Sequence, residues 1–317
     1  MDWKTFALVG GVLLLLSLAS AICHFLKRQP EGGINPGLVR TLTLRIRAWW
    51  LMCSILGVAY LPLEMGKFTT VLIFGLVSFW ALREFITLTP TRLGDHRSLF
   101  WVFFLFTPLQ FVLVGMENYG LYSVLIPVYG FLFIPARIAL AGDYQRFQER
   151  TATIQAGLMV CVYCFSYAPA LLTLKLTDQT VSPARLLFFF VVIVEMSDAF
   201  AWACGKLFGR RVIAPEISSN RTWEGFIGGA ACTTLLGTGL YWATPFNEWQ
   251  AAGMSLIVSV MGSVGGLTMS AIKRDRGVRD YGTLTEGRVG VLDRIDSLCF
   301  AAPVFFHLTK VYFTDNL

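Results

Sequence analysis

Charged residues are scarce in this sequence. Asp, Glu, Lys and Arg make up 15% of the 317 residues, whereas hydrophobic residues make up 55%. A typical soluble domain carries about 25% charged residues. The apolar residues also fall in repeated runs of roughly 20, the length that crosses a membrane as a helix. The lack of charge excludes an ordinary soluble protein, and the runs predict an all-α polytopic membrane protein with about ten transmembrane helices and short loops.

Histidine is rare, and cysteine is not organised into a recognisable site. The three histidines, His24, His96 and His307, are scattered along the chain. All seven cysteines lie in or beside apolar runs, and the CxxC pair Cys161 and Cys164 has no second pair or histidine nearby. These absences argue against a zinc centre of the usual ligand spacing and give no support to a Ser–His–Asp hydrolase.

Long soluble stretches and internal repeats are also missing. The segments between apolar runs reach only about twenty residues, and no repeat suggests the duplicated halves of many transporters. We therefore predict a single integral membrane domain over 1–317, with N-terminal helices in 1–183 and C-terminal helices carrying the polar motifs in 184–317. The predicted membrane helices cover residues 6–26, 48–64, 68–88, 99–116, 119–140, 152–173, 184–204, 225–244, 251–272 and 295–313.

The basic residues are concentrated in alternate loops. If the first loop faces the cytoplasm, most of the 26 Lys and Arg residues lie on the cytoplasmic side, in agreement with the positive-inside rule. The net charge of +6 is then a signal of topology and does not require a nucleic-acid partner. We predict that both termini are non-cytoplasmic and that the protein binds no nucleic acid.

The first apolar run has two interpretations. Lys4, the run itself and Ala19-Ser20-Ala21 resemble a cleavable signal peptide. The run is long, however, and it stays apolar until the basic pair Lys27-Arg28. We favour a retained membrane helix, because length and flanking charge both fit one.

Two acidic residues, Glu195 and Asp198, lie three apart inside a later apolar run. This spacing places both carboxylates on one helical face near its cytoplasmic end. Acids within a membrane are costly unless paired or metal-bound, so they are candidates for a functional site; the alternative is a structural ion pair with a neighbouring helix. The loop that follows is rich in glycine, hydroxyl and basic side chains, which suit phosphate. Its candidate residues are Lys206, Ser218, Arg221, Thr222 and Glu224.

The densest group of charges lies at residues 273–296, between two apolar runs. It contains eleven charged side chains in 24 positions. Asp293 and Asp296 share a helical face at the start of the last predicted helix, and basic residues predominate upstream of them. Paired carboxylates suit Mg²⁺, which often bridges to a substrate phosphate, and an excess of cations suits a polyphosphate. The two polar segments therefore predict a metal–nucleotide site at the membrane surface.

These segments also carry a family resemblance, over about residues 194–296. The first contains Asp198, Gly205, Leu207-Phe208-Gly209, Ala214-Pro215, Ile217-Ser218 and residues 222–229. The second contains residues 270–274, 279–284, Gly290 and residues 292–296. Together they resemble the recurrent motifs of the phosphatidate cytidylyltransferases, also called CDP-diacylglycerol synthases.

The resemblance implies an integral membrane enzyme that transfers a cytidylyl group from CTP to phosphatidic acid. The products would be CDP-diacylglycerol, for phospholipid biosynthesis, and pyrophosphate. The implied cofactor is Mg²⁺, alone or with a second cation, held by Asp198, Glu224, Asp293 and Asp296. The residues expected to act in catalysis are Asp198, Lys273, Asp280, Asp293 and Asp296. Those expected to bind substrate are Lys206, Ser218, Arg221, Thr222, Arg274, Arg279 and Arg288.

Arg288 is the main departure from the family pattern. The family typically has a proline, a glycine, a histidine and two further glycines where this chain has Glu286-Gly287-Arg288-Val289-Gly290. Arginine is always charged and cannot transfer protons as histidine does. If the histidine only hydrogen bonds to phosphate, Arg288 can replace it; if it transfers protons, this chain is slow, specialised or inactive. The departure favours a divergent paralogue within the family.

Other functions and arrangements remain open. The alternatives are a cytidylyltransferase acting on a different lipid phosphate and a non-enzymatic lipid-phosphate binder or transporter. The glycine pairs Gly225/Gly229 and Gly262/Gly266 permit close helix contacts within one chain or between two, so a homodimer is one of the options. The short loops favour a bacterial inner membrane surrounded by its lipids, with the active site on the cytoplasmic side.

Overall fold

The computed structural model describes residues 3–27, 63–89, 91–178, 180–278 and 290–314, and positions 43, 46, 49, 50, 52–54, 56, 57 and 59. The chain divides into two compact units, Met1–Thr70 and Val71–Leu317. Helix α1 (Trp3–Lys27) belongs to the first unit, and α3 (Leu63–Thr87) runs from the first into the second. All sites described below lie in the second unit. The single domain predicted for the whole chain stays a prediction.

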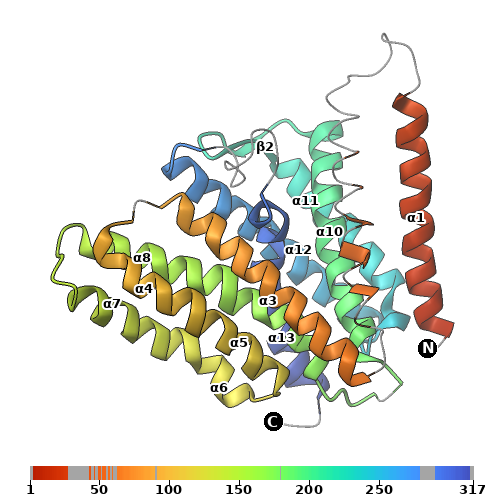
Figure 1. Ribbon diagram of the computed structural model, residues 1–317. Coiled ribbons are helices and arrows are strands. Elements are labelled where there is room, and N and C mark those ends of the chain that lie inside the picture. Colours follow the sequence, from red (N-terminus) through yellow and green to blue (C-terminus); the bar gives the residue numbers. More distant parts are fainter. Residues whose placement is uncertain are drawn as a thin grey trace. The chain divides into compact units, whose positions relative to one another are not determined.

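Helices form nearly all of the second unit (Figure 1). Several short α-helices are continued by π-helical or 3-10 turns. As a result, residues 93–115, 119–139 and 147–173 each form one continuous helical segment. Its first part consists of η1 (Leu93–Asp95), α4 (His96–Trp101), η2 (Val102–Phe106), α5 (Thr107–Gly115), α6 (Tyr119–Val124), η3 (Leu125–Gly130), α7 (Phe131–Ala139), α8 (Phe147–Leu158), η4 (Met159–Cys164), α9 (Phe165–Ala170) and η5 (Leu171–Thr173). Its second part consists of α10 (Pro183–Phe208), β1 (Val212–Ala214), β2 (Ser218–Thr222), α11 (Trp223–Gly239), η6 (Tyr241–Ala243), α12 (Glu248–Asp275) and α13 (Leu292–Phe313).

Seven helical segments among the described residues are long and apolar enough to cross a membrane. They are Trp3–Phe25, Met65–Thr87, Leu93–Gly115, Tyr119–Ala139, Phe147–Thr173, Pro183–Phe208 and Glu248–Asp275.

These seven segments confirm an all-α polytopic membrane protein. Each coincides with a predicted span, and α11 and α13 form helices at two further predicted positions without being among the seven. Helix α11 has only 17 residues, and α13 begins with the charged residues Asp293, Arg294 and Asp296. The predicted span 48–64 is described only at separate positions, so it stays a prediction. The count of ten and the side of the termini stay predictions.

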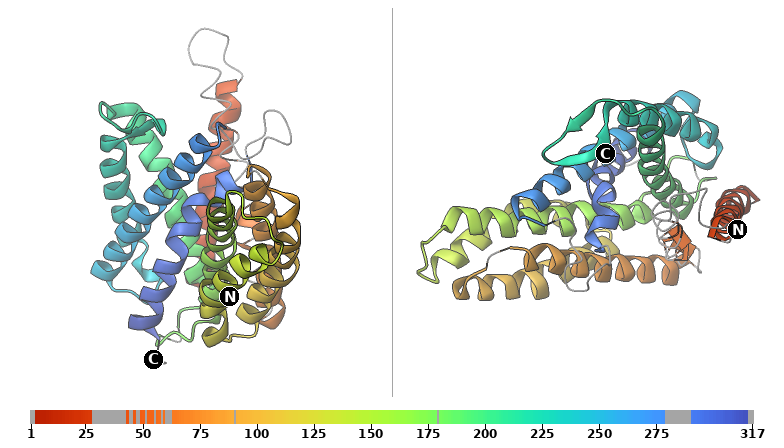
Figure 2. Two further views of the ribbon diagram at one scale, coloured as in Figure 1. Left: turned by 90° about the vertical axis from the view of Figure 1, so that its left-hand side faces the viewer. Right: turned by 90° about the horizontal axis from the view of Figure 1, so that it is seen from above.

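Aromatic packing holds α10 against α13. Phe188, Phe189 and Phe190 are consecutive and all buried in α10, and the ring of Phe190 stacks on that of Phe305 with centroids 4.8 Å apart. Buried aromatic rings dominate core energetics because each buries a large apolar area. Figure 2 shows α12 and α13 between α11 and the helices of residues 93–173. The charged end of α13 therefore lies among helices from both parts of the unit.

Glycine pairs let the C-terminal helices approach closely. A Cβ at Gly229 would lie 2.7 Å from the Ala201 backbone of α10, and one at Gly265 would lie 2.7 Å from the Phe300 side chain of α13. One at Gly262 would lie 3.4 Å from the Ser297 side chain. The glycines thus make contacts within the chain, as small residues do between membrane helices. The homodimer stays a prediction.

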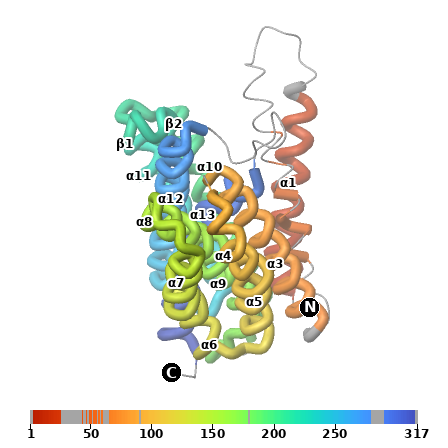
Figure 3. The backbone as a smooth tube through the Cα atoms, turned by 60° about the vertical axis from the view of Figure 1, so that its left-hand side comes forward, coloured from red at the N-terminus to blue at the C-terminus, as the bar shows by residue number. Residues whose placement is uncertain are grey.

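A short β-hairpin connects α10 to α11. Strands β1 and β2 are antiparallel, with Val212 opposite Thr222 and Ala214 opposite Ser218. The sequence had suggested only a loop here, because strands of three and five residues give little periodic signal. Figure 3 shows the hairpin beside the end of α12, at the end of the bundle where α10 stops. This end carries the candidate site.

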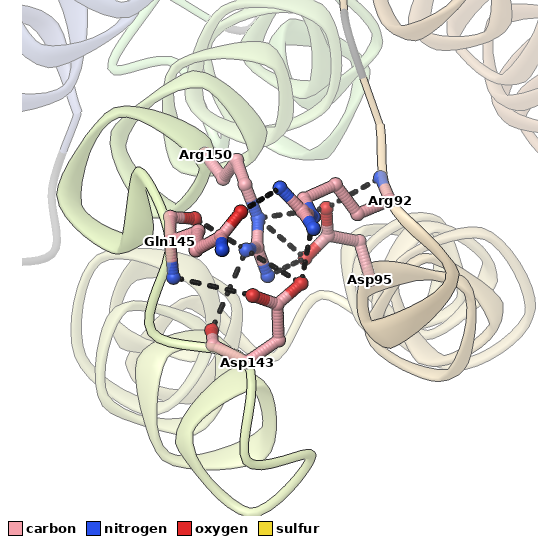
Figure 4. Close-up of polar contacts among 5 residues, drawn as sticks. All are labelled: Arg92, Asp95, Asp143, Gln145 and Arg150. Atoms are coloured by element: carbon pink, nitrogen blue, oxygen red, sulfur yellow. Dashed lines mark hydrogen bonds and ion pairs between the residues drawn. The ribbon is translucent and has the colours of Figure 1, made fainter.

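A buried ion-pair network joins η1, which directly precedes α4, to the first turn of α8 and the residues before it (Figure 4). The Arg150 guanidinium donates to both carboxylate oxygens of Asp95, with the shortest contact 2.7 Å, and their side chains are only 4% and 1% exposed. Asp143 accepts from Arg150 and Arg92 at 3.1 and 2.8 Å. The Gln145 carbonyl accepts a further bond from Arg150 at 2.6 Å. The shared contacts compensate the desolvation of the buried charges.

We expect Asp95→Ala to lower the free energy of unfolding by about 3 kcal/mol, because Arg150 would stay buried after losing the carboxylate that it contacts most closely. The matched control is Arg146→Ala, which removes a pair with Glu149 whose side chains are 65% and 40% exposed. That loss should not exceed about 1 kcal/mol. Denaturation of the detergent-solubilised protein measures both. Equal losses would mean that the buried network stabilises no more than a surface pair.

Candidate active site

Four charged side chains from four elements converge at the end of the bundle that carries the hairpin. Asp296 of α13 lies within electrostatic range of Asp198 of α10, Arg221 of β2 and Lys273 of α12. Asp198 and Asp296 are both only partly exposed. Two neighbouring carboxylates repel each other, and the two basic groups offset part of that repulsion. The arrangement is suited to bind a cation between the carboxylates and an anion at Lys273 and Arg221.

Asp293 lies one helical turn before Asp296, and each of its carboxylate oxygens accepts a hydrogen bond. Its Oδ1 accepts a hydrogen bond from Lys273 Nζ at 2.7 Å, and its Oδ2 accepts one from the Gly290 backbone N–H at 3.3 Å. The Asp293 and Lys273 side chains are 6% and 13% exposed. Asp293 and Asp296 are three apart in α13 and therefore share a face, and Lys273 at the end of α12 lies near both. Lys273 therefore bonds to Asp293 and lies within electrostatic range of Asp296.

Arg221 reaches across α12 over a glycine. Its Nη1 donates to the Ser263 backbone carbonyl at 3.0 Å. A Cβ at Gly266 would overlap the Arg221 guanidinium. A side chain at position 266 would therefore move Arg221, so the glycine creates the space that brings this cation beside Asp296. The sequence predicted Arg221 as a substrate-binding residue but gave no reason for Gly266 beyond helix packing.

Thr222 and Arg274 hold the hairpin in place. Thr222 is the N-cap of α11, and its Oγ1 accepts a hydrogen bond from the Gly225 N–H at 3.1 Å. The Nε of Arg274 donates to the Ile217 carbonyl at 3.0 Å, and its Nη1 donates to the Val278 carbonyl at 3.2 Å. Both residues were predicted to bind substrate. Their contacts fix the hairpin and the end of α12, and the predicted role in substrate binding stays a prediction.

Glu224 is engaged by the backbone of the hairpin loop. Its Oε2 accepts hydrogen bonds from the N–H groups of Arg210 and Arg211 at 3.0 and 3.2 Å. The bond from Arg210 is the main cause that lowers the pKa of the Glu224 carboxyl below its ordinary value, with smaller contributions from other backbone N–H groups. These contacts close the base of the hairpin. They give no support to the predicted role of Glu224 as a metal ligand.

The remaining predicted residues lie at the edge of the site or outside the described chain. Lys206 is exposed in the last turn of α10, and Ser218 begins β2. Arg279, Asp280 and Arg288 lie outside the described residues, and their predicted roles stay predictions.

The donor set fits Mg²⁺ on chemical grounds. In the described part of the chain, no group of three His, Cys, Asp or Glu side chains is arranged to hold a metal ion by itself. Mg²⁺ normally takes only one or two protein carboxylates and completes its shell with water and substrate phosphates. The neighbouring carboxylates of Asp198 and Asp296, with Lys273 and Arg221 placed for the phosphates, match that pattern.

Sequence reasoning missed Glu84 of α3. Its carboxylate accepts hydrogen bonds from the backbone N–H groups of Val291 and Leu292, at 3.0 and 2.8 Å, although more than 200 residues separate them. The signal in the sequence was an acid within a predicted membrane helix. It could not be connected to α13, because nothing local identifies a partner so far along the chain.

Comparison with known proteins identifies the family. The model of the cytidylyltransferase family matches residues 43–312. The chain belongs to this family. It is also similar to the uncharacterized protein YnbB of Escherichia coli (strain K12), with 36% identity over 309 residues that cover 95% of this chain and 97% of the relative. The residues matched by the family model include every element of the site described above.

Several relatives are named phosphatidate cytidylyltransferase, among them proteins from Bacillus subtilis and Staphylococcus aureus. The protein from Bacillus subtilis (strain 168) is 29% identical over 250 residues, which cover 77% of this chain and 89% of the relative. The protein from Staphylococcus aureus (strain COL) is 39% identical over 115 residues, which cover 36% of this chain and 44% of the relative. The predicted family is therefore confirmed. Membership supports nucleotidyltransferase activity, with CTP and a lipid phosphate as substrates, in an integral membrane protein.

Proposed function

We propose that the protein transfers the cytidylyl group of CTP to phosphatidic acid, giving CDP-diacylglycerol and pyrophosphate. The observation that carries the proposal is the convergence of Asp198 and Asp296 with Lys273 and Arg221. The relatives named for the phosphatidate reaction support the choice of acceptor. The basic loops at this end of the bundle support a site on the cytoplasmic side of a bacterial inner membrane.

The geometry suits a reaction that needs positioning and charge neutralisation. The lipid phosphate can itself attack the α-phosphorus of CTP, so the protein need not supply a covalent nucleophile. Lys273 and Arg221 would hold phosphate oxygens and neutralise the charge that develops on the leaving pyrophosphate. Asp198 and Asp296 would hold Mg²⁺, which would supply Lewis-acid stabilisation of the phosphoryl oxygens, and Asp293 would keep Lys273 in place beside them.

The test is product formation in membranes that contain the protein. With labelled CTP, Mg²⁺ and phosphatidic acid, we expect labelled CDP-diacylglycerol above an empty-vector background, and we expect Asp198→Asn to remove it. The control is Asp275→Asn, because the Asp275 side chain is 72% exposed at the end of α12; it should retain activity within about twofold. No CDP-lipid from any lipid phosphate would overturn the enzyme proposal and favour a binder or transporter.

A different lipid phosphate is the second candidate acceptor. The observation that favours it is Arg288, which stands where the family motif typically has histidine and which cannot exchange a proton at neutral pH. The same assay with a panel of lipid phosphates decides between the two acceptors. Phosphatidic acid should give the highest kcat/KM; a higher value for another lipid phosphate would replace it as the acceptor.

A further inference from the structure

Glu84 caps the first turn of α13 from another helix. Its Oε1 accepts from the Val291 N–H at 3.0 Å, and its Oε2 accepts from the Leu292 N–H at 2.8 Å. The side chain is only 7% exposed. The Trp80 Nε1 also donates to Oε1, at 3.2 Å, and the Arg83 guanidinium lies 5.2 Å from the centre of the Trp80 ring. The carboxylate is therefore held on α3 and directed at α13.

The start of α13 needs such a partner. The first N–H groups of a helix have no partner within the helix, and this end of a helix favours negative charge. Val291 occupies the N-cap position but has no side chain that can accept a hydrogen bond. Glu84 supplies two acceptor oxygens and a charge at the same place. A buried helix end of this kind would otherwise leave polar groups unsatisfied, at a cost of about 1–3 kcal/mol each.

The capped turn also carries Asp293. Glu84 accepts a hydrogen bond from the Leu292 N–H, and the next residue, Asp293, contacts Lys273 at 2.7 Å. Movement of this turn by about 1 Å would break that contact, because hydrogen bonds weaken steeply beyond their normal range. Asp296 lies one turn further along the same face. Glu84 therefore contacts the backbone of the turn that begins α13 and that leads directly into both carboxylates.

We propose that Glu84 is a positioning residue, which sets the placement of Asp293 and Asp296 by capping α13. The expected effect on activity rests on the proposed function. The hydrogen bonds by which Glu84 caps α13 do not depend on it. Helix α3 carries none of the family motifs quoted above. Through Glu84 it would nevertheless take a direct part in forming the site. Residues that orient metal-binding side chains typically change metal affinity by about 10–100-fold when they are mutated.

The test compares Glu84→Ala and Glu84→Gln with Ser78→Ala in the full-length, detergent-solubilised protein. Ser78 is the matched control, because it is also buried in α3 but its Oγ donates to the Cys161 carbonyl rather than to α13. In Glu84→Ala, we expect amide exchange at Val291 and Leu292 to rise about tenfold or more. The Mg²⁺ concentration for half-maximal thermal stabilisation and for half-maximal activity should rise about tenfold.

The variants separate positioning from general stability. Glu84→Gln keeps one acceptor oxygen and should lie between Glu84→Ala and the unmodified protein in both readouts, whereas Ser78→Ala should lower the melting temperature without changing the Mg²⁺ requirement. Unchanged amide exchange in Glu84→Ala would overturn the cap. Faster exchange with an unchanged Mg²⁺ requirement would overturn the positioning role. If the unmodified protein forms no CDP-lipid, the proposed function fails, and amide exchange with Mg²⁺-dependent melting still decides the role of Glu84.

Discussion

Asp296→Asn should reduce CDP-lipid formation by at least about 100-fold without lowering the thermal stability of the protein. Asparagine has nearly the same shape, and its Oδ1 can still accept the Ser297 N–H bond that Asp296 Oδ1 accepts at 2.8 Å. The substitution removes a partly buried negative charge beside Asp198. The loss of this repulsion stabilises the folded protein and offsets the lost attraction to Lys273 and Arg221. Activity and stability should thus respond differently to the same change.

Three measurements on solubilised Asp296→Asn check this result. The first is CDP-lipid formation from labelled CTP, the second is the melting temperature without divalent cations, and the third is the rise in melting temperature on adding Mg²⁺. The Mg²⁺-dependent rise should be lost. Asp275→Asn is again the control, because it changes an exposed carboxylate to an amide. A fall of several degrees in the melting temperature without cations would instead make Asp296 a structural residue.

Gly266→Ala should lower activity by about 100-fold, because a methyl group there would occupy the space of the Arg221 guanidinium. Alanine is otherwise favourable within a helix, by about 0.5–1 kcal/mol relative to glycine. The matched control is Gly253→Ala in the same helix, where a Cβ would meet no atom within 4 Å. That variant should keep full activity. CDP-lipid formation measures both.

A double variant shows whether Arg221 is the cause. In Arg221→Ala the space above Gly266 is empty, so the further change Gly266→Ala should cost no more activity. The two effects would then be non-additive, as expected for residues that act through one contact. Additive losses would show that Gly266→Ala harms the enzyme by another route, such as a shift of α12 against α13. The role of Gly266 as the space for Arg221 would then be wrong.

The charged block at 273–296 is both a topological and a functional feature. Its basic residues fit the positive-inside rule, yet Lys273 also bonds to Asp293 and lies near Asp296. Charge spacing along α12 and α13 places these groups at the ends of two helices that pack against each other. A membrane enzyme with short loops can therefore build its site from helix ends. This arrangement accounts for the density of charge in this block.

The sequence by itself determined the class of protein, most of its helices and the family. Apolar runs of about 20 residues have one stable solution in a membrane, and a spacing of three fixes a shared face for Asp293 and Asp296 whatever surrounds them. The motif segments also identified Asp198 and Lys273 as parts of one site. The class and the helices follow from local periodicity and residue chemistry, whereas the family follows from the resemblance of the motif segments to known sequences.

Only the tertiary structure decided which of the candidates meet. It placed Arg221 over Gly266, engaged Glu224 with the N–H groups of Arg210 and Arg211, and brought Glu84 to the start of α13. Each of these contacts depends on how helices far apart in the chain pack and rotate against one another. Local periodicity specifies which face a side chain occupies, but it does not specify which helix that face will meet.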